Sequence, residues 1–235
     1  MTLLIIYDNQ AYDHRLTPAW GFSCLVRLGH KGILFDTGGE GAILMQNAGL
    51  LGIDLAQVDT VVLSHMHGDH VGGLASVVQH NRTATIYLPA SASESFKREV
   101  RLAGPAVEEV TSPRQIAEDA FTTGELGSGL KEQALILRTL SGLVVITGCS
   151  HPGVVSMVGK AKQTVGGSVR LVVGGFHLGG ASTGAIQAAI EGLSGLGVQM
   201  LAPCHCTGDK ARRLFQKHLG ESYMDVGAGK RIEII

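Results

Sequence analysis

Strong charge of either sign is missing from this sequence of 235 residues. Nineteen Lys and Arg stand against 20 Asp and Glu, so the formal net charge is -1, and charged residues make up only 17% of the chain. No strong field therefore draws the chain toward nucleic acid or an anionic membrane. We expect a diffusible small molecule as the substrate, with no nucleic-acid and no membrane partner, and the sequence does not indicate an oligomeric state.

Long apolar runs and a cysteine framework are also missing. The longest apolar stretches, such as 143–146 and 171–173, have the length of a strand, whereas a membrane span needs about 20 residues. The segment 1–7 lacks the charged start and cleavage site of a secretory signal, which predicts a cytoplasmic protein. The cysteines are too few and too scattered for a disulfide framework, so we expect reduced thiols at Cys24, Cys149, Cys204 and Cys206.

What the sequence does have is apolar residues and glycine. Apolar residues make up 45% of the chain, enough for an ample core, and the 33 glycines indicate many tight turns between strands and loops. Apolar runs alternate with helical patterns, which predicts an α/β protein. The expected strands cover 3–7, 22–28, 32–36, 60–64, 85–88, 134–140, 142–147, 169–173, 198–202 and 231–235. The expected helices cover 39–51, 71–80, 93–101, 153–162, 183–196 and 208–219.

Two segments of the sequence resemble each other. Gly32-Ile-Leu-Phe-Asp-Thr-Gly38 and Gly142-Leu-Val-Val-Ile-Thr-Gly148 share their apolar spacing and a final Thr-Gly, which suggests two related halves. Each segment is expected to be the second strand of a hairpin. Because no linker separates the halves, we predict a single domain over 1–235. The less regular stretch 89–130 is predicted to be an insertion that covers the substrate.

The segment Ser64-His-Met-His-Gly-Asp-His70 carries the strongest chemical signal. It follows an apolar strand and precedes a helical pattern, so we expect it on a loop at the carboxyl end of the strand. Its imidazoles and carboxylate are ligands that Zn²⁺, Mn²⁺ or Fe²⁺ accept. His65 and His67 project to one side of an extended segment and can bind one ion, while Asp69 and His70 can turn toward a second. The alternative, a polar surface loop, would favour Asn, Ser and Lys over His.

Three more histidines follow apolar strands. They are His151 in Thr-Gly-Cys-Ser-His, His177 in Gly-Gly-Phe-His-Leu and His205 in Pro-Cys-His-Cys-Thr-Gly. One such histidine is more often structural, but three of them in a chain that already has a ligand cluster indicate a shared metal site. The other histidines, His14, His30, His80 and His218, are expected to be surface or turn residues.

These motifs resemble the metallo-β-lactamase superfamily, whose hallmark is His-x-His-x-Asp-His followed by isolated downstream ligands. The resemblance covers nearly the whole chain from Phe35-Asp-Thr-Gly38 onward. Within the superfamily, the sequence is most similar to the branch named for the 7,8-dihydropterin-6-methyl-4-(β-D-ribofuranosyl)aminobenzene 5'-phosphate synthases. The branch markers are Lys131-Glu-Gln-Ala-Leu135, Thr147-Gly-Cys-Ser-His-Pro-Gly153, Gly174-Gly-Phe-His-Leu178, His205-Cys-Thr-Gly208 and Gly227-Ala-Gly229. The resemblance implies an αββα sandwich of two mixed β-sheets flanked by helices.

The resemblance also implies a ligand set for one or two divalent ions, with zinc expected first and manganese or iron as alternatives. The first metal would be bound by His65, His67 and His151, and the second by Asp69, His70 and His205. Asp36 would hold the ligand loop by hydrogen bonds without touching the metal, or would only form the turn before Thr-Gly.

The sequence departs from the family pattern in three places. Most binuclear members have a bridging Asp between the third and last histidines, but no Asp lies between Asp119 and Asp209. Either His177 replaces the bridging carboxylate, or a hydroxide alone joins the ions and the second site is weaker. His177 itself is a ligand, a catalytic residue that faces the substrate, or a structural residue. The branch's usual Glu-His-Gly is replaced by Ala-Trp-Gly at 19–21. In addition, only four residues separate 124–126 from 131–133, where the family pattern has a longer loop. The thiols of Cys149 and Cys206 flank candidate ligands and are either close to the metals or ordinary buried cysteines.

Metal-assisted hydrolysis is the predicted chemistry. A metal-bound hydroxide would attack an ester, thioester or phosphoester of a small molecule, with or without a phosphate group. Asp69 would orient the nucleophile, and His177 would donate a proton to the leaving group. The first alternative is a dihydropterin ribofuranosylaminobenzene phosphate synthase-like transferase, although the departures around the substrate region weaken it. The second is a metal-binding sensor without catalysis.

Overall fold

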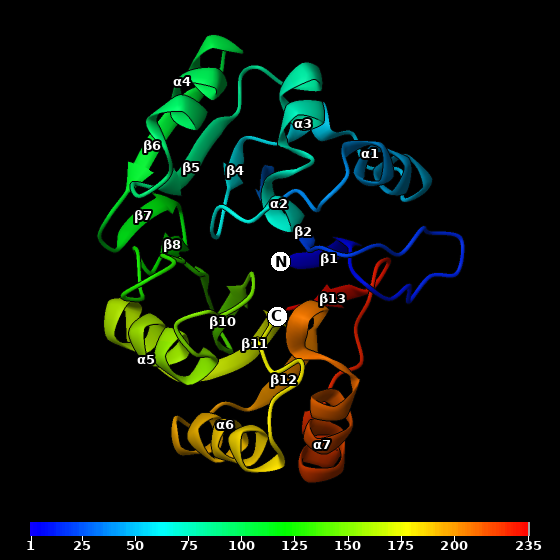
Figure 1. The fold of residues 1–235 in the computed structure, drawn as a ribbon, viewed down its shortest axis with the longest axis vertical. Helices are drawn as coiled ribbons and strands as arrows, with labels where there is room; N and C mark the ends of the chain where they lie inside the picture. The colour runs from blue at the N-terminus through cyan, green and yellow to red at the C-terminus, as the bar shows by residue number, and fades with distance from the viewer. Residues whose placement is uncertain (235) are drawn as a thin grey trace. The chain divides into compact units, whose positions relative to one another are not determined.

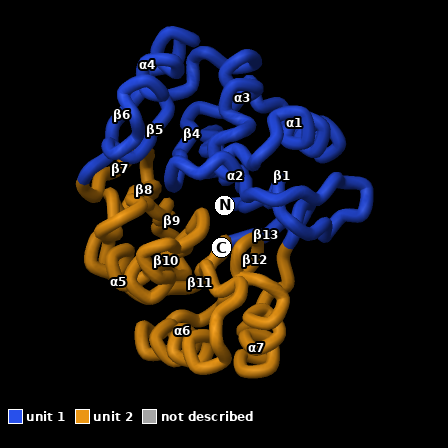
Figure 2. The backbone as a smooth tube through the Cα atoms, viewed as in Figure 1, with its two compact units in different colours: residues 1–111, 227–234 blue, residues 112–226, 235 orange. Residues whose placement is uncertain are grey.

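A computed structural model describes residues 1–234 of the chain, which form two compact units (Figure 2). Unit 1 comprises residues 1–111 and 227–234, and unit 2 comprises residues 112–226. The single domain predicted over 1–235 stays a prediction. Within residues 1–234, no helix has the length and apolar character needed to cross a membrane.

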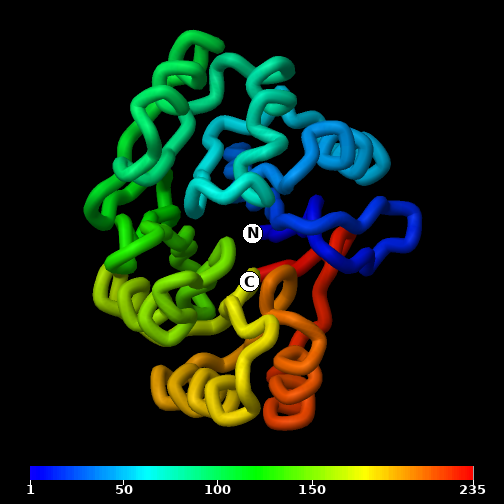
Figure 3. The backbone as a smooth tube through the Cα atoms, in the orientation of Figure 1, coloured from blue at the N-terminus to red at the C-terminus, as the bar shows by residue number. Residues whose placement is uncertain are grey.

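Unit 1 is built on a seven-stranded mixed sheet of order β13-β1-β2-β3-β4-β5-β6 (Figure 1). Its strands are β1 (Thr2–Tyr7), β2 (Ser23–Leu28), β3 (Lys31–Phe35), β4 (Thr60–Val62), β5 (Thr85–Pro89), β6 (Ala106–Val110) and β13 (Arg231–Glu233). Its helices are α1 (Gly41–Leu50), α2 (Gly68–Val71), α3 (Leu74–His80) and α4 (Glu94–Leu102). The strands from β13 to β3 pair antiparallel, and those from β3 to β6 pair parallel. Figure 3 shows the red C-terminal strand returning to the blue N-terminal strand of the same unit.

The core of unit 1 explains why the sequences of its central strands are continuous apolar runs. In β3 and β4 every residue after Lys31 is buried, which is typical of strands covered on both faces. Helix α1 packs on β1 and on α3. Its Asn47 is buried and donates to the carbonyls of Ile6 and Thr17, both at 3.0 Å, so the polar group inside the core is satisfied.

Unit 2 is built on a six-stranded mixed sheet of order β12-β11-β10-β9-β8-β7. Its strands are β7 (Arg114–Ala117), β8 (Ala120–Thr122), β9 (Leu135–Thr139), β10 (Gly142–Thr147), β11 (Val169–Gly175) and β12 (Met200–Cys204). Its helices are α5 (Val154–Val165), α6 (Thr183–Gly195) and α7 (Asp209–Leu219), with a 3₁₀ turn, η2 (His205–Thr207), after β12. Strands β10, β11 and β12 pair parallel, and β7 to β10 pair antiparallel.

Helices α5 and α6 each bury one stripe. In α5 the buried residues are Val154, Met157, Val158 and Ala161, and in α6 they are Ile186, Ala189, Ile190 and Leu193. Both sets follow the spacing i, i+3, i+4, i+7 of an amphipathic helix. Helix α5 packs on β9 and β10, and α6 packs on α5 and α7.

The predicted likeness of the two halves is visible in the sheets. In unit 1 the hairpin β2–β3 is followed by the parallel strands β4 and β5, and in unit 2 the hairpin β9–β10 is followed by β11 and β12. One Thr-Gly sequence begins two residues after the end of β3 and the other begins at the last residue of β10, the second strand of each hairpin. Both units therefore present the loops after their hairpins at the carboxyl ends of parallel strands.

Two segments differ from the sequence expectation. The helix expected over 71–80 is two helices, and Asp69 and His70 lie on α2 rather than on a loop. A Cβ added to Gly72 would lie 2.1 Å from the Gly39 carbonyl oxygen, so the break between α2 and α3 fits against a neighbouring backbone. The stretch 89–130 contains α4 and the strands β6, β7 and β8, and its role as a substrate cover stays a prediction. Ile235, included in the last expected strand, lies outside the described residues.

Candidate metal centre

In unit 1 the cluster at 64–70 begins directly after β4. Strand β4 is parallel to β3, and the loop that begins with Asp36 follows β3, so the two loops leave the same edge of the sheet. Ligand sites in α/β sheets are characteristically found outside the carboxyl ends of the strands. His67 has extended backbone angles (φ -74°, ψ 145°), and Gly68 starts the turn of α2 that carries Asp69 and His70.

Asp36 connects these two loops. Its carboxylate is fully buried and accepts hydrogen bonds from the Ser64 amide (2.7 Å) and the Ser64 hydroxyl (2.7 Å). Its Oδ2 also lies 2.7 Å from Nδ1 of His70. The expectation that Asp36 holds the ligand loop by hydrogen bonds is confirmed. Carboxylates that bind the second ring nitrogen of a histidine fix its tautomer and orientation for metal binding.

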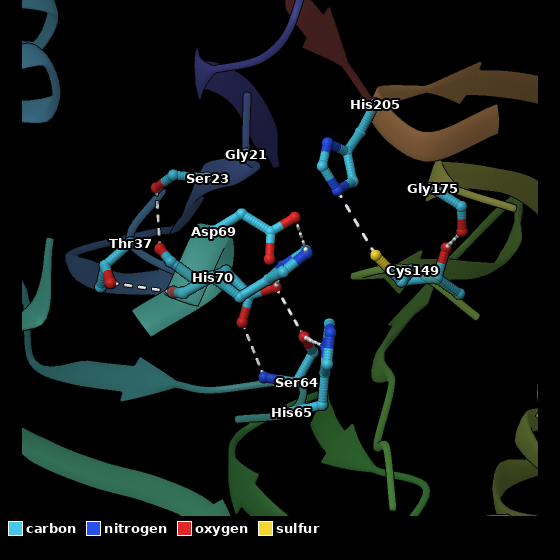
Figure 4. Close-up of polar contacts among 12 residues, drawn as sticks. Gly21, Ser23, Thr37, Ser64, His65, Asp69, His70, Cys149, Gly175 and His205 are labelled. Carbon is cyan, nitrogen blue, oxygen red and sulfur yellow. Dashed lines mark hydrogen bonds and ion pairs between the residues drawn. The ribbon is translucent and has the colours of Figure 1, made fainter. Parts of the chain in front are cut away.

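The histidines of the cluster lie close together (Figure 4). The ring centroids of His65 and His67 are 4.8 Å apart, and those of His65 and His70 are 4.2 Å apart. Nδ1 of His65 lies 2.9 Å from the Ser64 hydroxyl and Nδ1 of His70 contacts Asp36, so a metal would bind both residues through Nε2. Nε2 of His70 lies 3.6 Å from Oδ2 of Asp69. His67 is exposed and Asp69 partly exposed, so solvent can reach these two ligands.

Backbone contacts hold α2 in place. The carbonyl of His70 accepts hydrogen bonds from the amide (2.7 Å) and the hydroxyl (2.9 Å) of Thr37. A Cβ added to Gly73 would lie 2.1 Å from the Thr37 carbonyl oxygen, and one added to Gly21 would lie 2.5 Å from the Asp69 carbonyl oxygen. Only glycine allows this close approach, so several glycines near the cluster have a packing role.

In unit 2 three loops follow the parallel strands β10, β11 and β12 and carry the remaining candidate histidines. His151 follows β10, His177 follows β11, and His205 starts η2 directly after β12. The ring centroids of His151 and His177 are 4.2 Å apart. His205 is buried, whereas His177 is exposed. The backbones of His177 (φ 52°) and His205 (φ 48°) are in the left-handed region, which is uncommon for residues other than glycine.

Glu132 is the anchor of unit 2. Its fully buried carboxylate accepts hydrogen bonds from three consecutive amides, those of Cys149, Ser150 and His151, each at 2.8 Å. It thereby fixes the loop that carries His151. Glu132 lies within a branch marker of the sequence, but no role was predicted for it. The signal that could have found it is an acidic residue three positions before a strand that begins Leu-Ile-Leu, where a charge stays buried only if it is paired or hydrogen-bonded.

The loops of unit 2 also bring two thiols to the histidines. Sγ of Cys149 lies 3.4 Å from Nε2 of His205 (Figure 4), and the thiol of Cys206 donates to the Cys149 carbonyl at 3.5 Å. Hydrogen bonds from Cys149, together with contacts to His177, lower the pKa of the Cys206 thiol from its usual value, although burial opposes this. By contrast, burial raises the pKa of Cys24 in unit 1 to about 12.

The structure therefore assembles two sets of donors, one in each unit. In unit 1, His65, His67, Asp69 and His70 lie close to one another, and Asp36 contacts His70. In unit 2, contacts link His151 to His177, His205 to Cys149, and the two thiols to His177, and Glu132 holds the backbone of the loop that carries His151. Imidazole, carboxylate and thiolate are the donors that zinc and other divalent transition metals accept, so the chemistry of the residues fits a metal.

Comparisons with known proteins identify the family of this chain. Residues 20–174 match the family described as the Metallo-beta-lactamase superfamily. The 7,8-dihydropterin-6-methyl-4-(beta-D-ribofuranosyl)-aminobenzene-5'-phosphate synthase of Methanocaldococcus jannaschii is 29% identical, over 96% of this chain and 94% of that enzyme. The ribonuclease Z of Nocardia farcinica is 39% identical, but over only 32% of this chain and 25% of that enzyme.

A solved structure extends the comparison to the fold. Tm1679, a metal-dependent hydrolase of the beta-lactamase superfamily, is 29% identical, has a TM-score of 0.83, and is matched over 100% of this chain and 99% of that one. The predicted class of two mixed β-sheets flanked by helices is confirmed. The chain belongs to the metallo-β-lactamase superfamily.

Proposed function

We propose that this chain is a metal-dependent hydrolase of small-molecule esters, thioesters or phosphoesters. His65, His67 and His151 would bind one divalent ion, and Asp69, His70 and His205 a second. The observation that carries the proposal is the buried Asp36 carboxylate, 2.7 Å from Nδ1 of His70, because this is the support that metal-binding histidines characteristically have. Family membership adds that related chains include metal-dependent hydrolases.

A divalent ion would supply a hydrolytic nucleophile at neutral pH, because it lowers the pKa of bound water to about 7. Zinc is the proposed ion, with manganese and iron as alternatives. Most of the proposed ligands are imidazoles, which suit all three metals.

Two residues of the chain would act on the substrate and the nucleophile. Asp69 is partly exposed, and Asp36 fixes the neighbouring His70. The Asp69 carboxylate can therefore accept a hydrogen bond from the attacking water and orient it. His177 is exposed on the loop after β11 with its ring 4.2 Å from that of His151, where it can donate a proton to the leaving group. Removal of Asp69 should therefore lower kcat, and removal of His177 should penalise substrates with poor leaving groups most.

A synthase-like transferase is the second candidate. It is favoured by the similarity to the archaeal synthase over 96% of this chain. The two candidates differ in their requirement for a second organic substrate, because a transferase needs an acceptor and a hydrolase only water.

The test uses the purified full chain with its metal content measured. Phosphodiester, thioester and lactone substrates are assayed with and without chelator, next to a ribonuclease Z-type precursor RNA. Chelator-sensitive hydrolysis of a small molecule that Asp69→Ala abolishes supports the hydrolase. Turnover only with a pterin diphosphate and an aromatic amine acceptor would replace it with the transferase, and cleavage of the RNA alone would overturn the expectation of no nucleic-acid substrate. Full activity of metal-free protein would refute both candidates.

A further inference from the structure

Two buried thiols of unit 2 lie on the same loops as the candidate histidine ligands. Cys149 is 3% exposed and Cys206 is 8% exposed. Their Sγ atoms and a ring nitrogen of His177 all lie within 4.8 Å of one another. We propose that Cys149, Cys206 and His177 form a thiolate metal site that binds a soft divalent ion such as zinc; with this ion bound, His177 is a ligand and no longer the proton donor of the proposed hydrolysis.

The spacing of the donors is close to that of a bound ion. With Zn–S bonds of about 2.3 Å, two sulfur ligands of a tetrahedral zinc lie roughly 3.8 Å apart. Donors within 4.8 Å of one another therefore need to approach by about 1 Å, which side-chain rotation can provide. Sγ of Cys149 is already 3.4 Å from Nε2 of His205, about the distance between two ligands of one ion. His205 is thus placed beside the site as a further donor.

Charge favours sulfur at this place. The chain has no Asp between Asp119 and Asp209, so none of the three site loops of unit 2 offers an aspartate. The buried Glu132 carboxylate is occupied by three backbone amides. The thiols of Cys149 and Cys206 are the groups on these loops that become anionic when they bind a metal. Two thiolates balance the charge of a divalent ion, which imidazole ligands alone do not.

The loops are shaped closely around the sulfur atoms. A Cβ added to Gly175 would lie 2.6 Å from Sγ of Cys206 and 2.3 Å from the Gly148 carbonyl oxygen, so the backbone after β11 approaches the thiol directly. His177 adopts a left-handed backbone (φ 52°), which is strained for a residue with a side chain and is characteristic of functional sites. Since His177 is exposed, an ion can reach the site from solvent.

The experiment titrates Co²⁺ into the reduced full chain and records the near-ultraviolet sulfur-to-cobalt charge-transfer absorption. A strong band that saturates with bound cobalt is expected for wild type. Cys149→Ser and Cys206→Ser should each lose about half of the band intensity, because each removes one of two metal–sulfur bonds, and the double variant should lose it all. Cys24→Ala is the matched control, because this buried cysteine of unit 1 is outside the cluster and should leave the band unchanged.

Two further arms keep the outcome clear. X-ray absorption of the zinc-loaded wild type needs no variant and should show a sulfur shell at about 2.3 Å. His67→Ala removes a ligand of the proposed hydrolytic site and should abolish hydrolysis but keep the charge-transfer band. Cobalt bound without a band, a band that survives the double variant, or a zinc environment without sulfur would overturn the thiolate site. If the wild type shows the band but no metal-dependent hydrolysis, only the proposed hydrolytic function is refuted.

Discussion

Glu132 offers the sharpest test of how the loop of His151 is held. Each of its three hydrogen bonds pairs a buried carboxylate with a backbone amide at 2.8 Å, and such charge-assisted bonds contribute about 1.5–3 kcal/mol each. In Glu132→Gln the amide oxygen can still accept from Cys149 and Ser150, but the NH₂ group faces the amide of His151. One bond is lost and two lose their charge, so we expect the loop to be destabilised by about 3 kcal/mol.

The assay is native-state hydrogen exchange of the three amides. A loss of about 3 kcal/mol corresponds to exchange roughly 100-fold faster for residues 149–151. The surface variant Glu191→Gln is the control, because its carboxylate is exposed and accepts a hydrogen bond from the side chain of Gln187. If the folded Glu132→Gln protein protects residues 149–151 as well as wild type does, the anchoring role of Glu132 is wrong.

Three other substitutions test the remaining supports. Asp36→Asn should weaken metal binding by about 10–100-fold with little change in the circular dichroism spectrum, because the ligand loop loses its carboxylate; isothermal titration with zinc measures this. Gly72→Ala should unfold at a lower urea concentration than wild type, because its Cβ would meet a carbonyl oxygen at 2.1 Å. By contrast, an added Cβ at Gly49 has no atom within 4 Å, so Gly49→Ala should raise the free energy of unfolding by about 0.5–1 kcal/mol. Hydrogen bonds from Lys97 and then Arg101 lower the pKa of Glu109 in the folded protein. The stability that the Glu109 carboxylate contributes is therefore fully present above its unfolded pKa. It is lost as the pH falls through the lowered pKa of the folded state. Glu109→Gln should therefore flatten the decline of the urea midpoint between about pH 5 and about pH 3, and an unchanged decline would contradict the ion pair's role.

The sequence predicted the buried parts of the fold well. Strand β10 was expected over 142–147 and lies there, because strands buried on both faces are almost purely apolar. Strands β6 to β8 were not expected, since they include exposed residues and carry polar side chains such as Glu108, Glu109 and Gln115. Such segments, at or next to the edge of a sheet, take their structure from pairing with neighbours and not from their own pattern.

In the candidate site, too, features with a local sequence pattern were predicted and features that depend on distant residues were not. The histidine cluster was found because histidine at that density needs a chemical reason, whereas the anchoring role of Asp36 came from the family resemblance. Glu132 was missed because its partners are 17 to 19 residues away in sequence. The turn of α2 was missed because its helical form depends on contacts with the Thr37 loop. Long-range hydrogen bonds leave no periodic signal in the sequence.

The central claim is that the histidines on these loops bind catalytic metal ions. A crystal structure of the zinc-loaded protein, with the ions located by anomalous scattering, tests it most directly. We predict an ion with the ring nitrogens of His65, His67 and His151 at about 2.0–2.1 Å, and a second one bound by His70 and His205. The absence of any anomalous peak at these rings, with Asp36 still bonded to His70, would contradict the account.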